Sequence, residues 1–163
     1  MIRNNGGYFW MDEPRKSRFE KILEQYAGII KERDDALIRE KTARDQFEAS
    51  FRTAVDKVIL PAAAQVRELV EAKNWICRAI KADNGLSARI EIYQGNMKAA
   101  TGERPHTKLL ATAKVNDVQI YLASQSSGNL KQCTMKVEEV SQRIVQEHLL
   151  ELLEKLVAEG PPR

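Results

Sequence analysis

The chain has 163 residues, of which 43% are hydrophobic and 30% are charged, and its formal net charge is +3. This composition is typical of a globular protein with its own hydrophobic core and excludes an intrinsically disordered chain. Basic and acidic residues are interspersed, so the sequence contains no polybasic tail, and no run of about 18 apolar residues could form a transmembrane helix.

The N-terminus and the cysteines both bear on the compartment. Polar residues and glycines stand where a signal peptide would have its apolar segment. Two cysteines, Cys77 and Cys133, are too few for a disulfide framework or a zinc site. We therefore expect reduced thiols in a cytoplasmic protein, with a single Cys77–Cys133 bridge as the alternative. Residues 1–12 are expected to form a disordered leader, unless Met11 is the true start.

Helical spacing of apolar residues extends over Glu13–Ala82 and is interrupted once, by Pro61. Asp12 is a suitable N-cap for this region. Proline inside a helix removes a hydrogen-bond donor, so the sequence predicts a kink at Pro61 rather than a hairpin. Asp83-Asn84-Gly85 is predicted to end the helix, with Gly85 in the left-handed conformation.

The first part of this helical region has a seven-residue repeat with apolar ends and a charged middle. One seam position holds Phe19, Tyr26, Arg33, Glu40, Phe47 and Ala54, and the other holds Leu23, Ile30, Leu37, Arg44, Phe51 and Val58. Such a repeat is typical of a coiled coil. We expect this arm to form a homodimer, or alternatively to fold back within one chain, through Phe19, Leu23, Tyr26, Ile30, Leu37, Phe47 and Phe51.

Beyond Gly85 the pattern changes from helical to alternating. Strands are predicted over 87–94, 107–115 and 118–122, and a fourth has Cys133, Met135 and Val137 on one face. The short connections between them favour an antiparallel meander.

The last predicted element is an amphipathic helix over Ser141–Glu159, with Ser141 as its cap and Val140 and Val145 as a hydrophobic staple. We expect one apolar sheet face to pack against the 62–82 helix, the 141–159 helix, or both. The fold class is therefore α+β: a long kinked N-terminal helical region, a four-stranded antiparallel meander sheet and a C-terminal helix packed on the sheet. The predicted divisions are a leader (1–12), a helical arm (13–60) and an α+β domain (61–163).

The sequence contains no motif of a catalytic, cofactor or metal site. His148 lies within the last helix and is expected at the surface or its boundary. The two thiols lie on apolar faces, which raises a thiol's pKa. No cofactor or metal is therefore expected. The long loop from Gly95 to Pro105, followed by His106, is the only segment that leaves an enzymatic activity open.

One face of the predicted sheet is basic and contains tyrosines. Its candidate residues for contact with nucleic acid are Arg89, Tyr93, Lys108, Lys114, Tyr121 and Lys136. Aromatic rings there could stack on bases while the cations contact phosphates.

Two functions follow from these patterns. The first is a non-enzymatic protein–protein interaction module, such as an adaptor, a chaperone or an assembly component, that dimerises through its N-terminal helices and binds a further protein. The alternative is a nucleic-acid-binding regulator that uses the basic sheet face.

Overall fold

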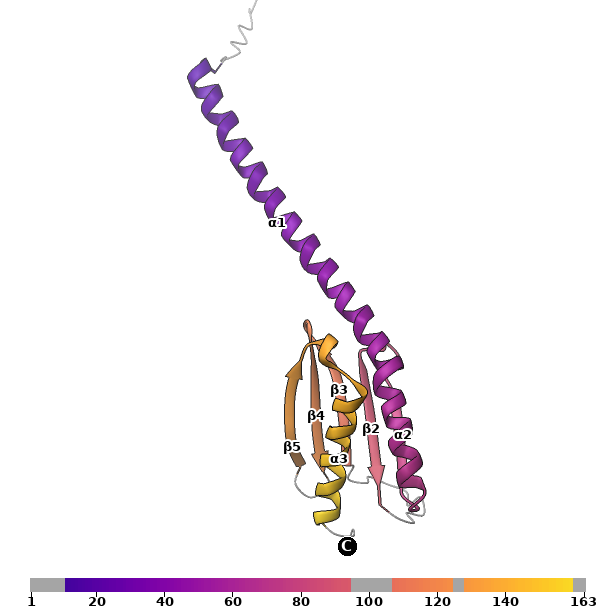
Figure 1. Ribbon diagram of the computed structural model, residues 1–163. Helices are drawn as coiled ribbons and strands as arrows, with labels where there is room; N and C mark the ends of the chain where they lie inside the picture. The colour runs from indigo at the N-terminus through magenta and orange to yellow at the C-terminus, as the bar shows by residue number, and fades with distance from the viewer. Residues whose placement is uncertain (1–10, 95–106, 125–127, 160–163) are drawn as a thin grey trace, which may run out of the picture. The chain divides into compact units, whose positions relative to one another are not determined.

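The structure, a computed structural model, describes residues 11–94, 107–124 and 128–159, and it has an α+β fold (Figure 1). The helical elements are α1 (Glu13–Ala54), a π turn η1 (Val55–Ile59), α2 (Leu60–Glu71), a 3-10 turn η2 (Val137–Glu139) and α3 (Gln142–Glu159). The strands are β1 (Ile76–Lys81), β2 (Ser87–Tyr93), β3 (Thr107–Lys114), β4 (Asp117–Ser124) and β5 (Gly128–Met135).

Contacts divide the chain into two compact units, Met1–Thr42 and Ala43–Arg163. The boundary between these two units lies within α1. The last turns of α1 belong to the second unit because Phe47 and Phe51 are buried in its hydrophobic core. Their rings stack with centroids 6.3 Å apart.

The first unit, over its described residues, consists of the N-terminal part of α1. Asp12 caps the helix, because its Oδ1 accepts a hydrogen bond from the Arg15 backbone N–H at 3.3 Å. The Asp12 carbonyl accepts a second bond from the Lys16 N–H at 3.0 Å. This is the N-terminus that the sequence predicts.

Pro61 does not interrupt the helical backbone, which continues from η1 into α2. The Leu60 N–H donates to the carbonyl of Val55, five residues earlier. Pro61 is the second residue of α2 and directly follows this π turn. The π turn thus accommodates the proline at the place where the sequence predicts a kink.

The sequence predicts a helix as far as Ala82, but α2 ends at Glu71, so this prediction was wrong. Asn74 takes the left-handed conformation with φ 62°. Its N–H donates to the Glu71 carbonyl at 3.0 Å, while the Trp75 N–H donates to the Val70 carbonyl at 3.0 Å. This pair of bonds is a Schellman motif, which satisfies the last carbonyls of a helix. The chain then turns directly into β1.

Over the described residues the sheet has five antiparallel strands in the order β1-β2-β3-β4-β5, so the prediction of four strands was wrong by one. β1 is the strand that was missed. Asp83-Asn84-Gly85 connects β1 to β2 instead of ending a helix, and Gly85 has φ 70°. The Gly85 N–H donates to the Ala82 carbonyl at 2.8 Å, and the Arg52 Nε donates to the Asn84 carbonyl at 2.9 Å.

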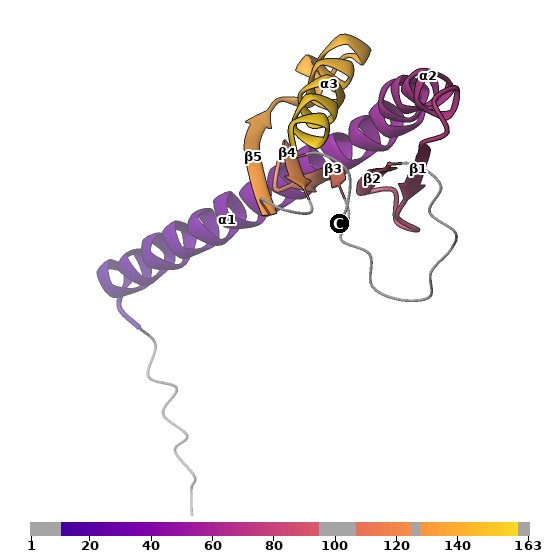
Figure 2. The same ribbon diagram turned by 90° about the horizontal axis from the view of Figure 1, so that it is seen from below.

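The hydrophobic core lies on one face of this sheet. Ile90 pairs with Leu109, and Leu109 pairs with Leu122, so apolar side chains of neighbouring strands share that face. Helices α2 and α3 contact each other and both lie on this side of the sheet in Figures 1 and 2. The buried cluster includes Phe51, Ile59 and Ala62 from the N-terminal side, Ile90, Leu109, Ile120 and Leu122 from the strands, and Val145, Leu149 and Leu152 from α3.

The start of α3 agrees with its sequence signals. Ser141 Oγ accepts a hydrogen bond from the Ile144 N–H at 3.2 Å, and the Ser141 carbonyl accepts one from the Val145 N–H at 3.1 Å. Val140 and Val145 are both buried, as a hydrophobic staple requires. Gln146 on α3 also donates to Gln65 on α2, which links the two helices.

Candidate interaction surface

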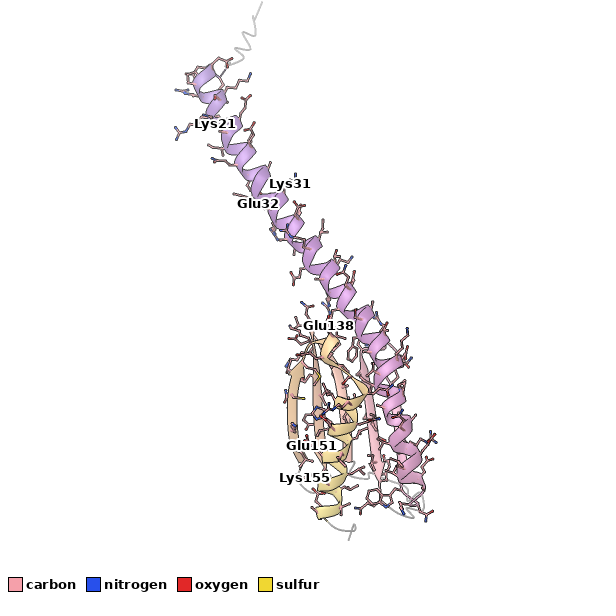
Figure 3. All side chains as sticks on the ribbon, in the orientation of Figure 1. Lys21, Lys31, Glu32, Glu138, Glu151 and Lys155 are labelled. Carbon is pink, nitrogen blue, oxygen red and sulfur yellow. The ribbon has the colours of Figure 1, made fainter. Side chains whose placement is uncertain are left out.

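Large apolar side chains are exposed along the part of α1 that belongs to the first unit. The exposed fractions lie between 52% and 63% for Phe19, Ile22, Leu23, Tyr26, Ile29 and Leu37. Ile30 is partly buried. We call this set of seven residues the apolar stripe. Figure 3 shows side chains projecting from this segment, where Lys21, Lys31 and Glu32 are labelled.

The stripe follows from helical geometry. Residues seven apart lie two turns apart on nearly the same side of a helix. Phe19 and Tyr26 therefore share one line, and Leu23, Ile30 and Leu37 share the adjacent line. Ile22 and Ile29 flank these two lines and widen the apolar surface.

The structure separates the predicted interface residues into two groups. Phe19, Leu23, Tyr26, Ile30 and Leu37 lie together on the stripe. Phe47 and Phe51 continue the same repeat, but they are 8% and 0% exposed and belong to the hydrophobic core. A side chain already buried by its own chain offers no surface to a partner. These two phenylalanines therefore do not extend the stripe.

Charge does not suggest an anionic partner for this segment. Residues 13–42 carry nearly equal numbers of basic and acidic side chains, which alternate along the helix. A helix that binds a nucleic acid or an anionic membrane has a basic surface instead. The stripe is therefore an apolar surface in a charge-balanced setting.

The basic sheet face gathers the residues that the alternation predicts. Paired residues of neighbouring strands lie on the same face of a sheet. Arg89 pairs with Leu110 and Leu110 with Tyr121, while Lys114 pairs with Asp117. These predicted residues of β2, β3 and β4 therefore lie on the face turned away from α2 and α3. Lys108 also lies there, opposite Glu91.

Carboxylates neutralise part of this basic face. Glu91 is buried, lies 2.8 Å from Arg89 Nε and accepts a hydrogen bond from the Tyr93 hydroxyl at 2.8 Å. Burial, together with this hydrogen bond, raises the pKa of Tyr93 to about 12. Lys136 Nζ lies 2.6 Å from Asp117, and the hydrogen bond raises the pKa of Lys136. Arg89 and Lys136 are thus already paired with acids.

His148 and Cys133 form a polar contact that sequence reasoning missed. His148 is 8% exposed and therefore buried, so the expectation of a position at the surface or its boundary was wrong. Its Nε2 lies 3.6 Å from Cys133 Sγ, and its Nδ1 has no hydrogen-bond partner among the described residues. The i, i+3, i+4, i+7 series formed by Val145, His148, Leu149 and Leu152 is the sequence signal that could have identified this buried position.

The Cys133–His148 pair is not arranged as an activated nucleophile. Burial raises the pKa of the Cys133 thiol and lowers the pKa of the His148 imidazole. Both shifts favour the neutral forms, whereas a nucleophilic cysteine needs a stabilised thiolate. Burial also raises the pKa of Cys77 to about 11, and both cysteines are free thiols.

A shallow cleft of about 340 Å³ lies between the β4–β5 edge of the sheet and α3. Its walls include Lys131, Glu151, Glu154 and Lys155, and Figure 3 labels Glu151 and Lys155. Lys131 Nζ lies 3.0 Å from Glu151, so these two charges neutralise each other. No feature of this cleft identifies a ligand.

Gly95–Pro105 and His106 lie outside the described residues. Within the described ranges, no cluster of three or more His, Cys, Asp or Glu side chains could hold a metal ion. None of the described helices combines the length and apolar character needed to cross a bilayer.

Comparison with known proteins gives no relative from which a role could be inferred. No protein-family model matches the chain, and neither the curated proteins nor the solved structures contain a match.

Proposed function

We propose that the protein is a non-enzymatic interaction module that associates with a second copy of itself through the apolar stripe of α1. The observation that carries this proposal is the exposure of the stripe on a helix that, among the described residues of its unit, has no other element to cover it. A contiguous exposed apolar surface marks an interaction site more often than a scattered residue does.

The energetics favour a covered stripe. Burying one large apolar side chain contributes about 1.5–3 kcal/mol. The total stability of a typical domain is only about 5–15 kcal/mol. Several such side chains left in water therefore forgo a large stabilisation, which pairing with a second helix would recover. The core of the second unit already has its own helices, α2 and α3, on the sheet.

A matched pair of substitutions tests this proposal. Leu23 lies on the stripe and Ile38 lies off it on the same helix, and both are 63% exposed. Leu23→Gln should weaken self-association at least about tenfold, because each copy loses a buried side chain. Ile38→Gln should leave it unchanged. Sedimentation equilibrium measures both, and equal effects of the two substitutions would contradict the role of the stripe.

The alternative is nucleic-acid binding through the basic sheet face. The observation that favours it is the strand register, which brings Lys108, Lys114 and Tyr121 onto the same face. This function requires binding that weakens steeply with salt and is lost in the Lys108→Glu, Lys114→Glu double variant. An absence of binding at low ionic strength would eliminate it. The pairing of Arg89 and Lys136 with carboxylates makes this face the weaker candidate.

A further inference from the structure

We propose that two copies of α1 pair antiparallel in one specific register, with Phe19 facing the partner's Leu37 and Tyr26 facing the partner's Ile30. In the same register, Leu23 faces the partner's Arg33 and Lys16 faces the partner's Glu40. This inference rests on the proposed self-association and specifies its geometry. It follows from the residues that occupy the two seam lines of the stripe and their continuation to Lys16 and Glu40.

A parallel arrangement places like charges together. In a parallel pair with matched ends, each seam residue faces its own copy, so Arg33 faces Arg33 and Glu40 faces Glu40. Lys16 likewise faces Lys16. Like charges brought together across an interface oppose association. In the proposed antiparallel register, no seam residue faces a residue of the same charge.

The neighbouring antiparallel registers are also less favourable. A shift of one heptad in one direction places Phe19 opposite the partner's Ile30, but it brings Lys16 against the partner's Arg33. A shift in the other direction places Glu40 opposite the partner's Leu23 and Phe19 opposite the partner's Arg44. Only the proposed register joins Lys16 to an acid while Leu37 remains covered by an aromatic side chain.

The position of Arg33 opposite Leu23 is compatible with a helical interface. The methylene groups of an arginine can cover an apolar neighbour while the guanidinium reaches water. Arg33 is already exposed to water on α1, so its guanidinium can stay in water when the two helices pair. The charged residues on the seam, Lys16, Arg33 and Glu40, therefore set the register. Polar seam residues are known to have this role in coiled coils.

Cysteine cross-linking in the full-length chain tests the register. Phe19→Cys and Leu37→Cys are introduced separately, each with Cys77→Ala and Cys133→Ser, and the two proteins are mixed under mild oxidation. In the proposed register, residue 19 faces the partner's residue 37, so the mixture forms a 19–37 disulfide that peptide mass spectrometry identifies. Two copies of residue 19 would stand about 27 Å apart along the axis, too far for a bridge.

Each other outcome overturns the register. Disulfides that join only two copies of the same variant, 19 to 19 or 37 to 37, would indicate parallel pairing. Efficient cross-linking of Phe19→Cys to Ile30→Cys would indicate the shifted antiparallel register. A dimer by light scattering that forms none of these bridges contradicts the register while self-association stands. A monomeric wild-type chain removes the proposed function as well.

A charge exchange supplies a second readout without replacing a stripe residue. Lys16→Glu should weaken the dimer about tenfold, because two opposite-charge pairs become like-charge pairs. Adding Glu40→Lys should restore the affinity. In a parallel pair the single change only replaces one like-charge contact by another, so an unchanged affinity, or no rescue by the second substitution, would contradict the proposal.

Discussion

Phe19 and Phe51 provide the sharpest test of how α1 divides between a folded unit and an interaction surface. Both are phenylalanines on the same helix within one seven-residue repeat, yet Phe51 is 0% exposed and Phe19 is 55% exposed. Replacing each by alanine removes the same atoms. The difference between the two variants therefore reports the environment of each ring.

Phe51→Ala should cost about 3–5 kcal/mol, since truncating a fully buried phenylalanine loses its transfer free energy and leaves a cavity. For a unit of this size that corresponds to a fall of about 10–20 °C in the melting temperature. The ring is stacked on Phe47 and lies in the core cluster, so little relaxation is available to fill the space. The loss should not depend on protein concentration, because the contacts lie within one chain.

Phe19→Ala should leave the melting temperature of the second unit within a few degrees, because its ring is outside that core. It should instead weaken self-association. Circular dichroism melts at two protein concentrations, combined with sedimentation equilibrium, separate the two effects. If Phe19→Ala lowered the melting temperature of a dilute monomer as much as Phe51→Ala does, Phe19 would be buried by its own chain, and our reading of α1 would be refuted.

Three further predictions concern single positions, each followed by urea or thermal unfolding. Gly85→Ala should destabilise the fold by about 1–2 kcal/mol, because φ is 70° and the new Cβ would lie 2.9 Å from Arg52 Cγ. Gly28→Ala should instead increase helicity, because nothing lies within 4 Å of its new Cβ. Equal effects of the two substitutions would contradict this prediction. Val115→Gly should stabilise by about 1 kcal/mol, since a β-branched residue there has φ 56° and is 80% exposed, and a loss of stability would exclude strain at this turn. Burial lowers the pKa of His148 below 6.5, so on acidification the unfolded chain takes up a proton at a higher pH than the folded chain does. Stability should therefore fall as pH drops through about 6.5, by at most about 1.4 kcal/mol per pH unit. His148→Leu should remove that part of the fall, and an unchanged pH profile would show that the pKa of His148 is the same in the folded and unfolded chain.

The parts of the fold that were predicted correctly have local signals that agree with their surroundings. Ser141, Val140 and Val145 define the start of α3 by hydrogen bonding and burial alone. Alternating apolar residues likewise define β2, β3 and β4, since a half-buried strand must place every second side chain on the core.

β1 was missed because its sequence is compatible with two structures. Ile76 and Ile80 are four residues apart and continue the helical pattern, but in the strand they lie on the face away from the core. The two positions on the other face are held by the small residues Cys77, which is buried, and Ala79, which is exposed, so the alternating signal is weak. Asn74 was the decisive residue, because it tolerates the left-handed conformation that ends a helix.

The division of α1 could not be predicted from its repeat. Phe19, Phe47 and Phe51 occur at spacings that place them on the same seam, and periodicity does not show which of them a sheet will cover. That information comes from long-range contacts, here with the core cluster around Ile59 and Leu149. His148 was misplaced for a different reason, because its polar side chain was given more weight than its helical spacing with the buried Val145, Leu149 and Leu152.

We propose that a second copy of the chain covers the apolar stripe. The most direct test is the molar mass of the full-length protein, measured by light scattering across a hundredfold dilution. Our account predicts a dimer that dissociates reversibly at low concentration, and a weaker dimer for Leu23→Gln than for Ile38→Gln. A monomer at every concentration, with the same mass in both variants, would contradict it.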